Sequence, residues 1–125
     1  MATITPTFAK IRGTAGGIDA VVTTWTGLVN SGDLGAGLQR TDISDRSISM
    51  TGTFGAGTVV FEGSNDSVDG VGGTWFTLSS PSGAALSFTA PGLLQVTEAT
   101  AWVRPHCTVT VTSVNAILTA RRSLR

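Results

Sequence analysis

The stretch that decides the fold class runs from residue 47 to residue 64 and reads SISMTGTFGAGTVVFEGS. In its first half, apolar and polar residues alternate. Ile48, Met50 and Phe54 share one side with Gly52, and hydroxyl residues occupy the other side. Because successive side chains of a β-strand point to opposite faces, this alternation is typical of a half-buried strand. We therefore predict a strand over residues 47–54.

The second half of the stretch predicts a second strand close by. Residues 55–57, Gly-Ala-Gly, are typical of a short turn. Alternation then resumes over residues 58–64, where Val59 and Phe61 share one face. Two alternating runs separated by a short Gly-rich turn indicate a β-hairpin. We expect Met50 and Phe61 to be buried on its inner face.

The same pattern recurs outward from this stretch, with turn signals about every ten residues. The loss of phase near Ser113 indicates a bulge or a turn into a final strand. Seven or eight short strands predict an all-β fold, either a single-domain antiparallel β-sandwich (jelly-roll-like) or a barrel. The further strands are expected at Ile4–Ile11, Ile18–Trp25, Thr74–Leu78, Ala85–Phe88, after Pro91-Gly92 to Val96, Ala101–Cys107, Thr108–Val111 and Val114–Ala120.

The 125 residues fit one domain, residues 1–125. Within it we predict an irregular N-terminal arm with possible strands over residues 1–42, a β-sandwich core over 43–120 and a basic tail over 121–125. Gly27–Gly37 is expected to be irregular and partly mobile.

The composition points to a covered surface. Charged residues make up 13% of the chain, against about 25% in ordinary soluble domains, and the mean hydropathy is +0.26. A domain of this size cannot hide so much neutral and apolar surface inside itself. We expect a partner or copies of the same chain to cover part of it. The alternative is a soluble monomer coated in Thr, Ser and Gly.

Charge and targeting signals restrict the partners. Eight basic and eight acidic residues give a net charge of zero, so no broad field attracts nucleic acid or lipid. The N-terminus lacks the basic region and long apolar run of a signal peptide, and no apolar stretch approaches the ~20 residues of a membrane span. We expect a protein made in the cytoplasm that contacts neither nucleic acid nor membrane.

No constellation of residues predicts catalysis. His106 and Cys107 are the only histidine and the only cysteine, but adjacent residues in a strand point to opposite faces. Asp42 and Asp45 lie beside Arg40 and Arg46, which indicates surface ion pairs rather than paired acid–base groups. We predict no enzyme, no catalytic residue and no cofactor.

One loop resembles the opening of a calcium site. Asn65, Ser67, Asp69 and Gly70 match the first positions of an EF-hand loop. The bidentate carboxylate expected at the twelfth position is replaced by Phe76, and no flanking helices are predicted. Asn, Asp and Gly are also the residues that turns favour, so we interpret residues 63–73 as a long turn-rich loop without metal.

Five segments share a pattern with a known group of proteins: Thr51–Asp66, Trp75–Leu78, Ala85–Ala90, Val103–Pro105 and Ala120–Arg122. Together they resemble small structural proteins of tailed bacteriophages, which are small β-domains found in virions. The resemblance implies a non-enzymatic virion component, and among virion roles we favour a capsid decoration (cement) protein. Proteins of that type commonly form trimers, which implies the major capsid protein and copies of this chain (a homotrimer) as partners, on the capsid exterior.

Two other roles stay open at this point. A tail, neck or fibre component would share the β-fold and the assembly logic. A carbohydrate-binding module would need Trp25, Trp75 or Trp102 flat on the surface, whereas an alternating strand more often turns its Trp inward. For assembly contacts we predict the irregular segment and the basic tail, because both lie outside the clear strands. The candidate interface residues are Leu28, Val29, Asn30, Asp33, Leu34, Arg121, Arg122 and Arg125.

Overall fold

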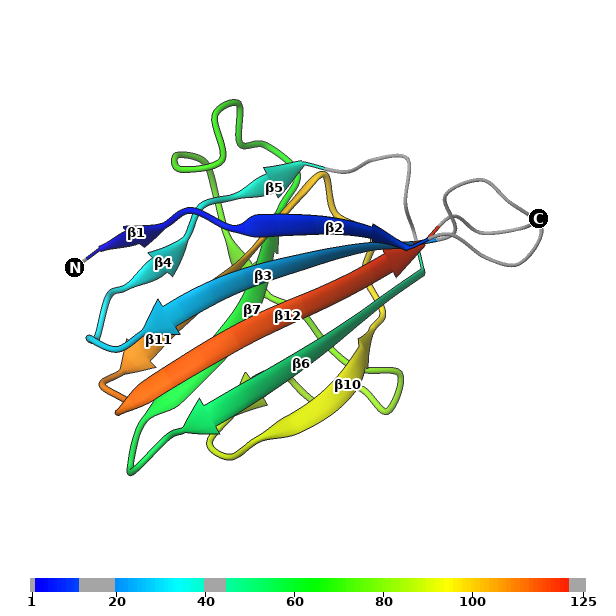
Figure 1. Ribbon diagram of the computed structural model, residues 1–125. Helices are drawn as coiled ribbons and strands as arrows, with labels where there is room; N and C mark the ends of the chain where they lie inside the picture. The colour runs from blue at the N-terminus through cyan, green and yellow to red at the C-terminus, as the bar shows by residue number, and fades with distance from the viewer. Residues whose placement is uncertain (1, 12–19, 40–44, 122–125) are drawn as a thin grey trace.

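The computed structural model describes residues 2–11, 20–39 and 45–121, and these form two β-sheets packed face to face (Figure 1). The described part contains no helix, so none that could cross a membrane. The predicted all-β sandwich is confirmed, and the sheets do not close into a barrel. The strands are β1 (Thr3–Ile4), β2 (Thr7–Ile11), β3 (Ala20–Leu28), β4 (Leu34–Gly35), β5 (Leu38–Gln39), β6 (Asp45–Thr53), β7 (Thr58–Ser64), β8 (Phe76–Thr77), β9 (Ser87–Phe88), β10 (Gly92–Val96), β11 (Trp102–Val109) and β12 (Ser113–Arg121).

One sheet, here called sheet B, has the strand order β10-β6-β12-β3-β2 and is antiparallel throughout. Its five strands lie in front in Figure 1. Every second residue is buried along β12, over residues 20–25 of β3 and over residues 45–50 of β6, which is the alternation expected of half-buried strands.

The other sheet, sheet A, has the order β1-β4-β11-β7-β8, with β5 also pairing β11 and β9 also pairing β7. Its long strands are β7 and β11, which pair antiparallel from Thr58 to Ser64. The short strands β1 and β4 pair in parallel at its edge. The apolar sides of both sheets meet in one core.

The core is built on two aromatic side chains from opposite sheets. Trp25 of β3 and Phe61 of β7 are fully buried, and their rings meet edge to face with centroids 6.4 Å apart. Ile48 and Met50 are also fully buried. The expected inward faces of both central strands are therefore confirmed.

The predicted hairpin between β6 and β7 is wrong. β6 pairs with β10 and β12 in sheet B, whereas β7 pairs with β8, β9 and β11 in sheet A. Both strands turn their apolar sides to the same core from opposite directions, and this requires them to lie in different sheets. Residues 55–57 cross between the sheets, with a hydrogen bond from Gly57 N to the Phe54 carbonyl and a φ of 60° at Gly55.

The described residues of the predicted irregular arm, 2–11 and 20–39, include five strands, β1 to β5. β3 is an internal strand of sheet B between β12 and β2, and it supplies Trp25 to the core. The strand predicted at Ile4–Ile11 is split at Thr5-Pro6, so that β1 joins sheet A and β2 joins sheet B. Proline lacks a backbone N–H and therefore suits a break in pairing. Ile18 lies outside the described residues.

The C-terminal half follows the prediction more closely. β11 joins the two strands predicted at Ala101–Cys107 and Thr108–Val111, ending at Val109. The loss of phase near Ser113 reflects a turn followed by a bulge, because the pairing of β12 with β3 shifts between Val114 and Ala116.

Candidate functional site

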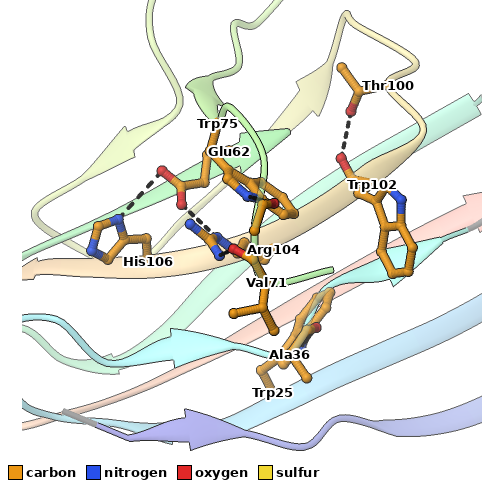
Figure 2. Close-up of polar contacts among 10 residues, drawn as sticks. Trp25, Ala36, Glu62, Val71, Trp75, Thr100, Trp102, Arg104 and His106 are labelled. Carbon is orange, nitrogen blue, oxygen red and sulfur yellow. Dashed lines mark hydrogen bonds and ion pairs between the residues drawn. The ribbon is translucent and has the colours of Figure 1, made fainter. Parts of the chain in front are cut away.

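The outer face of sheet A carries a buried charged cluster (Figure 2). Glu62 of β7 lies directly opposite Arg104 of β11 in the strand register. Arg104 Nε donates to Glu62 Oε1 at 2.7 Å, and His106 Nδ1 lies 3.4 Å from Glu62 Oε2. The Glu62 and Arg104 side chains are only 9% and 10% exposed, so this ion pair is held largely away from water.

A loop, residues 65–75, closes over this cluster. The Arg104 guanidinium carbon lies 3.9 Å from the centre of the Trp75 ring, within the range of a cation–π contact. Arg104 Nη1 also donates to the Val71 carbonyl at 3.4 Å, and Trp75 Nε1 donates to the Gly72 carbonyl at 3.0 Å. A guanidinium stays protonated and cannot exchange a proton at neutral pH. The cluster therefore fixes the loop on sheet A.

The loop holds its own shape through two aspartates. Asp66 Oδ1 accepts from Ser64 Oγ at 2.9 Å and from Thr74 N at 2.7 Å. Asp69 Oδ1 accepts from the N–H groups of the two residues at 71 and 72. These hydrogen bonds lower the pKa of both carboxyls. In the described part of the chain, no three His, Cys, Asp or Glu residues lie close enough to share a metal ion.

His106 and Cys107 point to opposite faces, as the strand period predicts. His106 lies on the outer face beside Glu62, whereas Cys107 is fully buried in the core. Burial raises the pKa of the Cys107 thiol, which keeps it protonated at neutral pH. The pair therefore does not form an activated nucleophile.

The outer face of sheet B has a different chemistry. At its centre, outward-facing residues form two rows, each with one residue from every strand of the sheet. The register places neighbouring residues of a row directly opposite each other on adjacent strands. The described residues of these rows include no charged side chain, and charge begins only where Asp45 lies opposite Arg121 at the end of β6 and β12. We call these two rows the uncharged face: Leu93, Ser49, Ile117, Thr24 and Thr7 in one, and Gln95, Ser47, Thr119, Val22 and Ala9 in the other.

A pocket of about 370 Å³ opens beside β8. Phe76 is 67% exposed beside it, and the buried Leu78 contributes an apolar wall. Two carboxylates, Asp66 and Glu98, also line it. Glu98 accepts from Ser79 N at 2.8 Å and from Ser79 Oγ at 2.5 Å, and these hydrogen bonds lower its pKa.

The predicted interface residues are placed unevenly. Leu28 is fully buried in the core and Asp33 is 2% exposed, so these two side chains serve the fold rather than a contact surface. Leu34 and Val29 are half-buried. Asn30 is exposed.

Asp33 serves the fold because its carboxylate accepts several backbone hydrogen bonds. Its carboxylate accepts from the backbone N–H groups of Asn30 at 2.9 Å, Val29 at 3.1 Å and Ala2 at 2.8 Å. These bonds order the turn that we expected to be irregular, and they lower the pKa of Asp33, the bond from Asn30 most of all.

The basic tail is described only at its start. Arg121 is exposed at the end of β12, and Arg122 and Arg125 lie outside the described residues. Of the acid–base group at residues 40–46, Arg40 and Asp42 also lie outside them, whereas Arg46 is 4% exposed and donates to the Thr100 carbonyl. Arg46 is therefore buried, whereas Asp45 beside it is exposed.

The tryptophans do not form a flat exposed platform. Trp25 is buried and its Nε1 donates to the Ala36 carbonyl at 3.0 Å. Trp75 is half-buried against Arg104, and Trp102 is half-buried with no hydrogen-bond partner for its indole N–H among the described residues.

Sequence reasoning missed both the uncharged face and the Phe76 pocket. For the first a partial signal was available, because Ser47 and Ser49 of β6 alternate with the apolar residues of that strand and lie on that face.

Comparisons with known proteins bear on the fold. No family model matches the chain, and no curated protein matches it in sequence. Among solved structures, the SPBc2 prophage-derived protein YomS is similar with a TM-score of 0.59 and 13% identity, over 81% of this chain and 93% of that protein.

Two weaker similarities are to the cleaved adhesin domain of Lys-gingipain from Porphyromonas gingivalis and to the Cnp3 cupin domain of Schizosaccharomyces pombe. The adhesin domain has a TM-score of 0.41 at 10% identity, over 96% of this chain and 85% of that one. The cupin domain has a TM-score of 0.40 at 11% identity, over 94% of this chain and 61% of that one. The chain thus shares its β-sandwich fold with a prophage-derived protein.

Proposed function

We propose that this chain is a non-enzymatic virion structural protein, and specifically a capsid decoration protein that binds the assembled phage head and stabilises it. The observation that carries the proposal is the uncharged face of sheet B. The centre of a protein–protein interface is depleted of charged residues, because each buried charge must be desolvated. A sheet face of hydroxyl, amide and apolar side chains without charge avoids the cost of desolvating a charge.

The rest of the molecule supports the same assignment. On sheet A, the chain's own loop lies against Arg104 of the charged cluster, whereas no described segment lies over sheet B in Figure 1. Only 13% of the residues are charged, which fits a domain whose surface is shared with neighbours. The resemblance of Thr51–Asp66 and the later segments to phage structural proteins is joined by a prophage-derived protein of the same fold.

A decoration protein would act by mass action. It would bind the assembled shell but not its dissociated subunits, so that its binding free energy adds to shell stability. Contacts between its own copies, as a trimer, would raise the effective concentration at the shell. The major capsid protein and copies of this chain are therefore the proposed partners, on the capsid exterior.

The test compares phage particles with and without this protein. We expect particles that lack it to burst at lower temperature, and purified protein to restore their stability. Sedimentation at micromolar concentration checks self-association alongside. If depleted particles keep full thermal stability but lose tail structure or host attachment, the tail, neck or fibre role is correct and the decoration role is wrong.

A further inference from the structure

The pocket beside β8 combines an aromatic ring, an apolar wall and fixed negative charge. Phe76 is 67% exposed although a large apolar side chain is usually buried, and Leu78 behind it is 3% exposed. Gly63 adjoins them, and a side chain there would meet Thr100 Oγ1 at 2.3 Å and Leu78 at 3.0 Å. A larger residue at position 63 would therefore displace Thr100 and Leu78, two of the side chains that line the pocket.

The two carboxylates of the pocket are held in place. Glu98 is fixed by Ser79 through both its oxygens, and Asp66 is fixed by Ser64 and by the N–H of Thr74. A carboxylate offers about four acceptor positions, so each can still accept from a bound group.

Among the residues that the structure describes, no basic side chain lines the pocket. The remaining lining residues are neutral: Gly63, Asn65, Thr74, Phe76, Thr77, Leu78 and Thr100.

We propose that this pocket binds an arginine side chain of a partner protein. The aliphatic part would pack on Leu78, the planar guanidinium would stack on Phe76, and its N–H groups would donate to Asp66 and Glu98. The pocket is anionic, whereas a sugar site needs no net charge, and this difference favours a cation over a carbohydrate. The inference rests on the proposed function only in naming a capsid subunit as the source of that arginine.

The test uses the whole purified protein and an acetylated, amidated Gly-Arg-Gly peptide, followed by NMR chemical shifts. The same peptide with citrulline in place of arginine is the matched control, because it has the same shape without the charge. We expect the arginine peptide to bind about tenfold more tightly, with shifts centred on Phe76, Thr77 and Glu98. Equal binding of the two peptides, or no shifts at the pocket, would overturn the proposal. So would a glucose trisaccharide that binds there in place of the arginine peptide.

Two variants sharpen the test. Glu98→Gln keeps the shape and can still accept from Ser79 N, while its amide N–H can donate to Ser79 Oγ. It removes a charge, and we expect it to weaken the binding of the arginine peptide about tenfold. Asp69→Asn is the control. It removes a carboxylate that lies in the loop of residues 65–75 but does not line the pocket, and it should leave the affinity for the arginine peptide unchanged. An equal loss in both variants would mean that the peptide responds only to net charge, and the site would be refuted.

The peptide and the particle experiments fail independently. If the arginine peptide binds the pocket but the purified protein does not stabilise depleted particles, the pocket is established and the decoration role is refuted. If Glu98→Gln protein stabilises depleted particles as well as the original protein does, the pocket does not contact the capsid. A capsid subunit is then refuted as the source of the arginine, while the decoration role stands.

Discussion

The two outer faces of this sandwich differ in their charge and in whether the chain's own loop lies over them. On sheet A, Glu62 and Arg104 pair at 2.7 Å and residues 65–75 fold over them. On sheet B, the two central rows carry no charge and no described segment lies over them in Figure 1. Charge on the first face is used within the molecule to hold a loop. Its absence from the second lowers the cost of docking against another surface, so changes to the two faces should affect different properties.

The core beneath both faces sets the largest expected effect. Phe61→Ala removes a fully buried ring that meets Trp25, and we expect it to lower the free energy of unfolding by ~3–5 kcal/mol. Chemical denaturation measures this loss. Phe76→Ala is the matched control, because that ring is 67% exposed, and it should cost under ~1 kcal/mol. A loss under ~1 kcal/mol for Phe61→Ala would show that the faces of β7 are assigned wrongly.

The next effect tests whether the outer face of sheet A serves stability. Arg104→Ala removes the arginine partner of the buried Glu62 carboxylate and the hydrogen bond to the Val71 carbonyl of the loop. This change should lower the free energy of unfolding by about 3 kcal/mol. Hydrogen exchange should show residues 65–75 opening first. If the variant instead keeps its stability and its ordered loop but fails to bind particles, the two faces have been assigned the wrong roles.

The turn before β4 gives a smaller, pH-dependent effect. The pKa of Asp33 is lowered by the N–H groups that it accepts from, so its stabilisation is present above its unfolded pKa of about 4 and is lost as the pH falls toward the folded value. Asp33→Asn should cost about 1–2 kcal/mol at pH 7. Denaturation at pH 7 and pH 3 should show this difference shrinking in acid. A difference that grows in acid would contradict the assignment.

The smallest effect concerns His106 and Cys107. Because they point to opposite faces, replacing both with alanine should cost about 1 kcal/mol in packing and leave particle binding unchanged. Particle co-sedimentation with the stably folded double variant checks this. Loss of binding at full stability would restore a functional role to the pair.

The sequence predicts the faces of strands well and their partners poorly. Alternation correctly placed Met50 and Phe61 in the core, because side-chain direction is a local property of the backbone. It misplaced β6 and β7 in one hairpin, because the pattern does not state which other strand forms the hydrogen bonds. Two consecutive strands that face the same core show the same alternation of apolar and polar residues, whether they pair in one sheet or belong to two sheets.

The candidate sites depend on contacts between distant residues, so they were harder to predict. The sequence indicated that Asp33 belongs to an irregular segment. In the structure its carboxylate accepts a hydrogen bond from the backbone N–H of Ala2, 31 positions away. The Phe76 pocket likewise combines β8 with Glu98, 22 positions further on. The uncharged face required the register of five strands, and only its hydroxyl alternation was visible beforehand.

Particle binding by a variant of the uncharged face tests the central claim most directly. Thr24 lies on β3, an internal strand of sheet B between β12 and β2. Thr24→Lys should leave the free energy of unfolding within ~1 kcal/mol of the original, because a long side chain can extend into water. The control is Ala84→Lys, an exposed position in the connection between two strands of sheet A. We expect Thr24→Lys to bind depleted particles at least about tenfold more weakly than Ala84→Lys, since docking would bury an unpaired charge. Equal binding by the two folded variants would contradict the claim that this face contacts the capsid.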